Sequence, residues 1–334
     1  MQIKRVITRF AMFLLIAALL DQMAGAFFET LANKLIPDVL RPNKVRMEEF
    51  YGHRDNIDVL FMGSSHAYNG FNPFIFDDIL DLNSFNLSGP GQNPTTTYYV
   101  LEEVLRVGHR PKLIIIETYW GMLTENYTKY MSASGVFHHM EFSATKFAMF
   151  RSACDFPSSL KLLSRAVKNR QAMIECSTTL IKRLSQKEIM GAEQYLGKGY
   201  VESSAIVSAA ALKNNGFKNQ KYSLDQHRLH FLEKTINDAK KRGIQVVLVS
   251  TPLPPTVFSD VQGYQELYGT INEIANKHGI KYIDYNILNS KLGMFSDEDF
   301  MDDDHLNRSG AGILGEHLGK LLISIYGERL QSLN

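Results

Sequence analysis

Short apolar runs alternate with amphipathic helical patterns over two separate stretches of the chain. The runs typical of buried strands cover residues 58–62, 84–87, 112–118, 245–250 and 280–283. Apolar positions at helical spacing follow several of them, over residues 94–107, 223–243, 261–278 and 307–326. Because strands that alternate with helices form parallel sheets, we expect an α/β fold with helices on both faces of the sheet.

Residues 120–222 break this alternation. They contain helical patterns separated by polar loops near residues 197–199 and 214–216. We interpret them as a helical insertion that covers the end of the sheet where the parallel strands finish, which is where ligands of such sheets bind. One domain is therefore expected over residues 56–330, with the insertion at about 120–222 and a polar helical connector at 29–55.

The N-terminus combines a basic flank with a long apolar segment. Lys4, Arg5 and Arg9 precede an apolar run that reaches Leu20, is interrupted at Asp21 and continues over residues 23–28. Residues 1–28 therefore fit a membrane anchor, in which residues 7–28 are long enough to span a bilayer. They also fit a signal peptide that is cleaved near Ala26, and the third alternative is a helix of a cytosolic protein. We favour the anchor, and both of the first two alternatives place the domain outside the cytoplasm because the basic flank stays inside.

The overall charge argues against one class of function. The 334 residues include 36 basic and 35 acidic side chains, which leaves a formal net charge of +1. Nucleic-acid-binding proteins carry a clear basic excess, so we expect no nucleic-acid partner. The two cysteines, Cys154 and Cys176, lack metal-site spacing and leave open whether they form a disulfide. We expect no metal and no cofactor.

The first chemical motif follows the first predicted strand. Residues 63–66 read Gly-Ser-Ser-His. A nucleophile at the end of a strand needs an exposed hydroxyl and backbone N–H groups directed at the developing oxyanion. Ser65 is the candidate, although a sequence of this kind is also common in turns.

The second motif lies just before the last predicted helix. Residues 302–305 read Asp-Asp-Asp-His, and Asn307 is the expected N-cap of the helix. A serine nucleophile needs a base, and the base needs a carboxylate that orients it. Asp302 and His305 have a spacing that allows this contact within one turn. The alternative is a group of acidic capping residues beside a surface histidine.

A third motif follows the second predicted strand. Residues 86–93 contain Gly89 and Gly91, and Asn93 opens the next helix as its N-cap. Glycines at this place permit a backbone N–H to turn towards an oxyanion. A plain loop between a strand and a helix is the alternative.

Taken in this order, the motifs resemble those of the SGNH/GDSL hydrolase superfamily. The resemblance covers roughly residues 57–118 and 223–326, and residues 302–311 carry its most specific part, Asp-x-x-His-Leu-Asn-x-x-Gly-Ala. It implies a three-layer, flavodoxin-like sheet, with Ser65 as the nucleophile and Asp302 and His305 as the other members of a triad.

The resemblance also implies an oxyanion site. The N–H groups of Ser65 and of Gly91 (or Gly89) would serve as two of its donors. The superfamily's Gly-x-Asn-Asp block is replaced here by Glu-Thr-Tyr-Trp-Gly at residues 117–121, and Ser64 stands where an aspartate is usual. Asn93 is the candidate for the third donor.

Four residues are expected to line the substrate cleft: His66, Glu117, Tyr119 and Trp120. The looser pattern and the N-terminal anchor are similar to those of envelope-acylating branches of the superfamily, which act on lipoteichoic acid, alginate and peptidoglycan. This similarity implies an extracytoplasmic acyl-ester hydrolase or O-acyltransferase that acts on a cell-envelope glycan or polymer, beside a membrane-bound O-acyltransferase. The alternatives are a catalytically degenerate adaptor of the same fold and a cytosolic α/β protein without ester chemistry.

Overall fold

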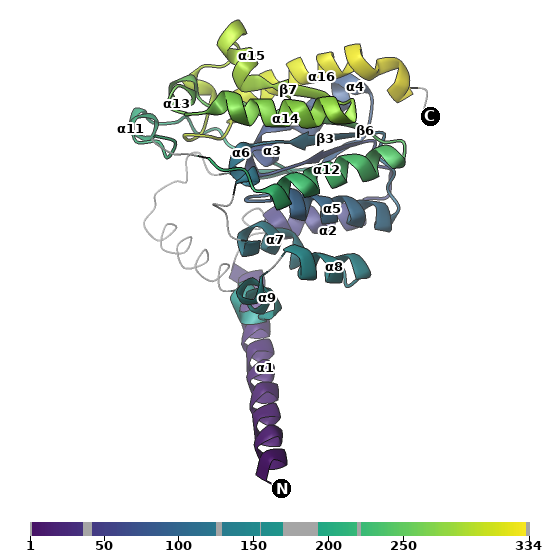
Figure 1. Ribbon diagram of the computed structural model, residues 1–334, viewed down its shortest axis with the longest axis vertical. Helices are drawn as coiled ribbons and strands as arrows, with labels where there is room; N and C mark the ends of the chain where they lie inside the picture. The colour runs from purple at the N-terminus through teal and green to yellow at the C-terminus, as the bar shows by residue number, and fades with distance from the viewer. Residues whose placement is uncertain are drawn as a thin grey trace.

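A computed structural model describes residues 2–35, 42–124, 129–153, 155–169, 193–218 and 222–331 (Figure 1). Cys154 and Cys176 lie outside these ranges, so whether they form a disulfide stays open.

A five-stranded parallel sheet forms the centre of the domain. Its strands, in the spatial order β2-β1-β3-β6-β7, are Ser84–Asn86, Val59–Met62, Leu113–Glu117, Gln245–Ser250 and Lys281–Asp284. Every neighbouring pair is parallel. The strand order reverses direction next to β1, so the crevice at the carboxyl ends of β1 and its neighbours is the expected place for a ligand. The predicted α/β class and parallel sheet are confirmed.

Successive strand residues point to opposite faces of the sheet and enter two separate cores. Leu60, Ile114 and Leu248 belong to one buried cluster, whereas Phe61 and Ile115 belong to the other. The first core is covered by α2 (Pro42–Gly52), α5 (Pro94–Val107), α8 (Ala144–Ala153) and α12 (Gln226–Lys241). The second core is covered by α3 (Ser65–Gly70), α4 (Pro73–Leu80) and α16 (Arg308–Gln331). In Figure 1, α4 and α16 lie above the sheet and α5 and α12 below it, which makes three layers.

Further helices complete the domain. They are α6 (Trp120–Leu123), α7 (Lys129–Phe137), α9 (Phe156–Leu163), α11 (Ala209–Lys213), α13 (Pro255–Phe258), α14 (Tyr264–His278) and α15 (Tyr285–Leu292), with a 3-10 turn, η2, at Asp297–Asp299. The N-cap of α12 is Asp225, whose side chain accepts from the N–H groups of His227 and Arg228.

The insertion contains a hairpin that the hydrophobic pattern did not predict. Strands β4 (Gln194–Gly197) and β5 (Tyr200–Glu202) pair antiparallel and form a sheet of their own. The hairpin turn contacts the end of β2, where the N–H of Asn86 donates to the carbonyl of Lys198 at 2.8 Å. Gly199 has a φ of +81°, and a Cβ there would lie 1.8 Å from the carbonyl oxygen of Asn86, so only glycine fits this approach.

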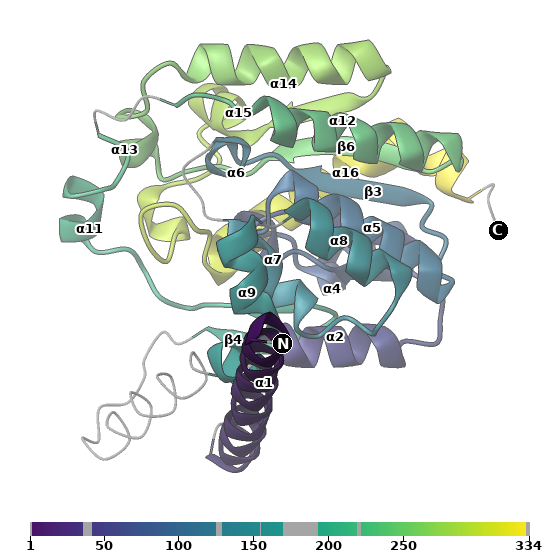
Figure 2. The same cartoon turned by 60° about the horizontal axis from the view of Figure 1, so that its bottom comes forward.

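Helix α1 (Gln2–Leu35) projects from the base of the domain (Figures 1 and 2). Its residues 3–20 are all exposed, and the most apolar 18-residue window within residues 3–31 has a mean hydropathy of 1.9. Among the described residues, this is the one helix long and apolar enough to cross a membrane. The helix extends past the predicted anchor and replaces the first part of the predicted connector.

Candidate active site

Ser65 is the first residue of α3, directly after the end of β1. Gly63 leaves the strand with a φ of +151°, a conformation that favours glycine, and Ser64 caps α3 by accepting from the N–H of His66. The N–H of Ser65 has no acceptor among the described parts of the chain. The sharp exit therefore places the Ser65 hydroxyl and an unused N–H at the carboxyl edge of the sheet.

His305 reaches Ser65 from the opposite end of the sequence. Its Nε2 lies 2.7 Å from Ser65 Oγ, a hydrogen-bond distance. The loop that carries His305 is fixed at both ends, by a bridge between Phe300 and Leu306 and by Asn307, which accepts from two N–H groups at the start of α16. The two motifs at the ends of the predicted sheet are thus brought together.

Two carboxylates share the other ring nitrogen of His305. Asp302 places both of its oxygens 3.0 Å from Nδ1, and Asp304 places one oxygen at 2.6 Å. Burial alone would lower the pKa of His305, but Asp304 and Asp302 raise it well above its usual value. The pKa of Asp302 is correspondingly lowered: burial opposes the shift, and the charge of His305 together with the hydrogen bonds from His305 and from the N–H of Asp304 outweighs it. Asp304 was not predicted, although it lies in the same Asp-Asp-Asp-His motif.

Glu117 holds in place the loop of Gly63 and Ser64, which precedes the nucleophile candidate Ser65. It lies at the carboxyl end of β3 and is buried, and it accepts from the N–H of Ser64 at 2.9 Å and from the Ser64 hydroxyl at 2.7 Å. The N–H of Tyr119 donates to its other oxygen. Burial raises the pKa of Glu117 to about 7, although these hydrogen bonds oppose the shift. The side chain expected in the cleft thus holds the loop before Ser65.

His66 lies between Ser64, which bonds to Glu117, and Asp304, which contacts His305. Its Nδ1 lies 3.2 Å from Ser64 Oγ, and its Nε2 lies 3.7 Å from Asp304. Its ring stacks on Tyr119 with centroids 3.8 Å apart. Burial and the neighbouring His305 lower the pKa of His66 well below its usual value, so the ring is neutral. His66 and Tyr119 therefore form one wall beside His305.

Trp120 packs inside the protein. It is 3% exposed, and its ring lies within 4.8–6.1 Å of the rings of Tyr119, Phe217, Tyr222 and Tyr264. This aromatic cluster joins α6 to the end of the insertion and to α14. Trp120 thus contributes packing below the site instead of an open surface for a sugar ring.

The two glycines in the loop after β2 differ in how their N–H groups are used. Gly89 uses its N–H to bond the carbonyl of Gly63 at 3.1 Å, which ties the loop to the exit of β1. Gly91 has a φ of +68°, and its N–H has no acceptor within the described ranges. Asn93 caps α5, with its side-chain oxygen accepting from Thr96 at 3.1 Å. Gly91 is therefore the loop residue with a free donor, and the Asn93 side chain is held at the helix start.

Two sets of described side chains near the site have the composition of a metal-binding group. One is His66, Asp304 and His305 and the other is Asp302, Asp303 and Asp304, and the ligand atoms of each set lie within 4.8 Å of one another. However, His305 directs Nε2 to Ser65 and Nδ1 to the two carboxylates, so both of its nitrogens are engaged. The arrangement fits proton transfer to and from Ser65.

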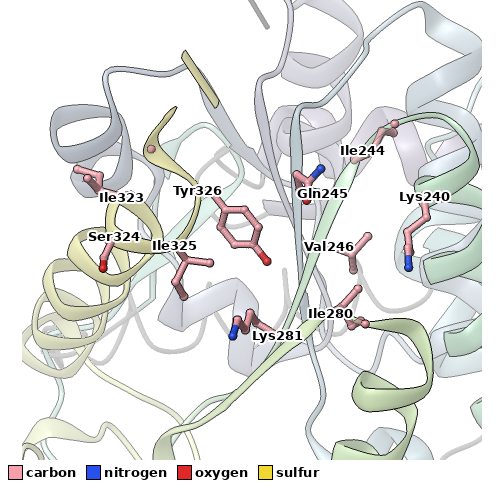
Figure 3. A pocket seen from close by; sticks show the side chains of 13 residues that line it. Lys240, Ile244, Gln245, Val246, Ile280, Lys281, Ile323, Ser324, Ile325 and Tyr326 are labelled. Atoms are coloured by element: carbon pink, nitrogen blue, oxygen red, sulfur yellow. The ribbon is translucent and has the colours of Figure 1, made fainter. Parts of the chain in front are cut away.

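A large cavity lies at the other end of the sheet. It has a volume of about 800 Å³ and lies between the starts of β6 and β7 and the end of α16, lined by Lys240, Lys281 and Tyr326 among others (Figure 3). None of its lining residues belongs to the Ser65 site. Parallel α/β sheets bind ligands at their carboxyl edge, so the Ser65 site remains the candidate.

The fold and the site define a three-layer α/β protein with a serine, a histidine and two aspartates in hydrogen-bond contact. The family model described as "Protein of unknown function (DUF1574)" matches residues 27–309, and the chain belongs to this family. None of the curated proteins compared with the chain matches it.

Similar solved structures have low sequence identity to the chain. One is a proposed acylhydrolase from Bacteroides fragilis, with 12% identity and a TM-score of 0.41, covering 86% of this chain and 98% of its own. Another is a GDSL-like lipase from Bacteroides thetaiotaomicron, with 11% identity and a TM-score of 0.40, covering 85% of this chain and 98% of its own.

Proposed function

We propose that the chain is a membrane-anchored serine enzyme of the SGNH type that cleaves or transfers acyl esters. The observation that carries the proposal is the 2.7 Å contact between Ser65 Oγ and His305 Nε2, with Asp302 on the opposite ring nitrogen. A hydroxyl, an imidazole and an orienting carboxylate in this order activate a serine for attack on a carbonyl.

Each step has a residue in place. Ser65 Oγ bonds to the ester carbonyl carbon while its proton passes to His305 Nε2. The tetrahedral intermediate then breaks its bond to the alcohol oxygen, which takes the proton from His305. The resulting acyl-serine is attacked by a second hydroxyl, whose proton passes to His305. The bond between the acyl carbon and Ser65 Oγ then breaks, and His305 returns the proton to Ser65 Oγ. Water as the second hydroxyl gives hydrolysis, and a sugar or polymer hydroxyl gives transfer.

The oxyanion of the intermediate would be stabilised by backbone donors. The N–H groups of Ser65 and Gly91 are both free of protein acceptors among the described residues. The Gly89–Gly63 hydrogen bond fixes the two loops relative to each other. Donors that are held in place before the reaction stabilise developing charge without reorganisation.

The substrate class in this proposal is an O-acylated polymer of the cell envelope. Support comes from α1, whose exposed apolar segment would hold the domain next to a membrane. Lys4, Arg5 and Arg9 lie at the start of that segment, and by the positive-inside rule this end would stay in the cytoplasm and the domain would lie outside it.

A fluorophosphonate probe and p-nitrophenyl acetate test the proposed chemistry on the full chain in detergent. We expect the probe to label the wild type and the Ser324→Ala control, whose exposed serine lies on α16, and not Ser65→Ala or His305→Ala. Labelling that persists in Ser65→Ala, or a wild type that neither reacts with the probe nor hydrolyses the ester, would contradict the proposed enzymatic activity.

One observation favours a second candidate, a non-catalytic adaptor. Residues 118–123, which follow β3, contain no asparagine or glutamine that could serve as a third oxyanion donor. An adaptor would bind an envelope glycan or a membrane-bound O-acyltransferase through the same edge of the sheet. Unlabelled protein that still co-purifies with such an acyltransferase, from cells that produce both, would support the adaptor.

A further inference from the structure

A polar groove lies where α1 meets the domain. Its volume is about 330 Å³. It is lined by α1, α7, the start of α8 and the segment after α9, through Gln22, Glu29, Phe137, His138, Lys146, Leu162, Leu163, Ser164, Arg165 and Lys168. In Figure 1, α9 lies beside α1 at the point where the helix leaves the domain. The groove shares no residue with the Ser65 site.

Direct contacts fix α1 in this position. The carboxylate of Asp21 accepts from the Ser164 hydroxyl and from the N–H of Arg165, the latter at 2.8 Å. Asn169 donates to the carbonyl of Gly25 at 2.9 Å. The domain therefore begins to hold the helix at Asp21, and residues 3–20 are exposed.

Helix geometry places the groove at the height of lipid headgroups. At 1.5 Å per residue, residues 3–20 extend over about 27 Å, close to the thickness of a bilayer's hydrocarbon core, about 30 Å. Lys4, Arg5 and Arg9 lie in the first two turns of this stretch, where their long side chains extend to the cytoplasmic interface. Gln22 and Glu29, which mark the groove on α1, are then within about 12 Å of the hydrocarbon boundary. The headgroup layer occupies about 5–8 Å on each side of the core, so it overlaps the groove.

The groove carries an excess of positive charge. Lys146, Arg165 and Lys168 line the groove together with one carboxylate, Glu29, which pairs with Arg165 at 2.5 Å and with Lys168 at 3.4 Å. The carboxylate of Asp21 lies beside the groove and is engaged by the Ser164 hydroxyl and the Arg165 N–H. Lys146 has no carboxylate partner in the described part of the chain and donates to the carbonyl of Met140 at 2.8 Å. A phosphate oxygen would be the acceptor that Lys146 and the partly paired cations lack.

His138 offers a further donor. Its Nε2 is buried and has no hydrogen-bond partner among the described residues. Burial and the nearby Lys168 and Lys146 lower the pKa of His138 to about 4, so the ring is neutral, and the tautomer with its one N–H on Nε2 would be the donor. A buried polar nitrogen without a partner is costly unless something completes its hydrogen bond.

The rim of the groove is apolar on the side of α9. Leu163, which lines the groove, is 60% exposed, and Leu160, one turn earlier, is 55% exposed. An exposed leucine pair beside cations is typical of surfaces that lie in the interface of a bilayer.

We propose that this groove binds the phosphate headgroup of an anionic phospholipid, with Lys146, Lys168 and His138 as donors and with Leu160 and Leu163 against the acyl chains. The proposal rests on the membrane-anchored state of the proposed function and does not depend on the Ser65 chemistry. Such a lipid would fix the height and tilt of the domain above the membrane.

Short-chain lipids test the groove on the full chain in a non-ionic detergent. We expect dihexanoylphosphatidylglycerol to raise the unfolding temperature and to give one bound lipid per chain by native mass spectrometry. Dihexanoylglycerol, which lacks the phosphate, should do neither. Lys146→Gln should weaken the lipid's Kd about tenfold or more, because a charge-assisted hydrogen bond is lost. Lys146→Arg should retain binding, and Lys320→Gln, an exposed lysine on α16, is the matched control.

Three outcomes would overturn the proposal. They are the absence of lipid binding, an unchanged Kd in Lys146→Gln, and a temperature shift that inorganic phosphate reproduces at equal concentration and ionic strength. Intact mass of the purified chain shows whether α1 is retained, which separates a failure of the anchor from a failure of the groove. Ser65→Ala should bind the lipid like the wild type, so a catalytic failure leaves this test unaffected.

Discussion

The carboxylate of Asp304 lies 2.6 Å from His305 Nδ1, on the same ring nitrogen that Asp302 faces at 3.0 Å. The other oxygen of Asp304 lies 3.7 Å from His66 Nε2. Asp304 therefore stands between two imidazoles, one directed at Ser65 and one buried against Tyr119. Two carboxylates on one nitrogen stabilise the protonated form of His305, which is the form that cannot accept a proton from serine.

Replacing Asp304 should change the pH at which the site becomes active. His305 must lose its proton to act as a base, so we expect the rate of ester hydrolysis to rise with pH as His305 titrates. Because Asp304 raises the pKa of His305, Asp304→Asn should move the midpoint of kcat/KM against pH to lower pH. The measurement is a pH–rate profile for p-nitrophenyl acetate with both proteins. A midpoint that stays in place, or moves up, would show that Asp304 does not set the charge of His305.

Asp302→Asn should act mainly on the rate. Asp302 contacts His305 Nδ1 through both oxygens and also accepts from the N–H of His305 at 2.7 Å, so it fixes the ring and its backbone together. An amide cannot stabilise the imidazolium, and we expect kcat to fall by about 10²–10⁴-fold. Unfolding temperatures of the two aspartate variants provide the control for folding. If Asp304→Asn loses more activity at its own optimum than Asp302→Asn does, the orienting role belongs to Asp304.

The hydrophobic pattern predicted the sheet well because its strands are short, buried runs. All five predicted strands are present, and β6 coincides with the predicted residues 245–250. The hairpin of β4 and β5 was missed, since β4 alternates between exposed and half-buried positions and β5 is a three-residue strand. The helix predicted over residues 223–243 begins later, at Gln226, because the side chain of Asp225 caps it.

The site residues close in sequence were predictable, and their partners across the fold were not. Ser65 and His305 were chosen from local motifs, and the structure places them 2.7 Å apart. The side chain of Glu117 reaches the Ser64 loop because β3 pairs with β1, and this pairing cannot be read from the sequence. The donor at Gly91 could be separated from Gly89 only once the Gly89–Gly63 hydrogen bond was seen.

The orientation of the domain can be measured by cysteine accessibility. With the two native cysteines replaced by serine, Lys320→Cys on the exposed face of α16 should react with a membrane-impermeant maleimide in intact spheroplasts. Lys4→Cys, in the basic flank, should react only after the membrane is permeabilised, because that flank remains in the cytoplasm. The reverse pattern would place the domain in the cytoplasm, and labelling of neither in intact spheroplasts would also contradict export.

Gly63→Ala should disrupt the nucleophile loop. Gly63 has a φ of +151°, and a Cβ there would lie 2.6 Å from the Cβ of Glu117 and 2.8 Å from its carboxylate. We expect a loss of about 2 kcal/mol or more in the free energy of unfolding, with loss of probe labelling at Ser65. Gly269→Ala in α14 is the matched control, since its Cβ would meet no atom within 4 Å, and it should be neutral or stabilising. Equal stability of the two variants in urea unfolding would rule out the close contact with Glu117.

Glu117 should make the protein less stable as the pH rises. Its pKa in the folded protein is about 7, against an ordinary value of 4.5, because burial disfavours the carboxylate. Between these two values the unfolded chain releases the proton while the folded protein keeps it. The free energy of unfolding therefore falls with pH over this range, by about 2–3 kcal/mol between pH 5 and pH 8 for this one group.

The variant Glu117→Gln removes this titration. Its amide N–H₂ group must face one of the donors from Ser64 or Tyr119, so the variant is less stable by an amount that does not depend on pH. Urea unfolding of both proteins at pH 5 and pH 8 measures the difference, and the exposed Glu316→Gln on α16 corrects for general effects of charge. The wild type should lose stability relative to Glu117→Gln as the pH rises; a difference that is constant across this range would show that the buried carboxyl titrates outside it.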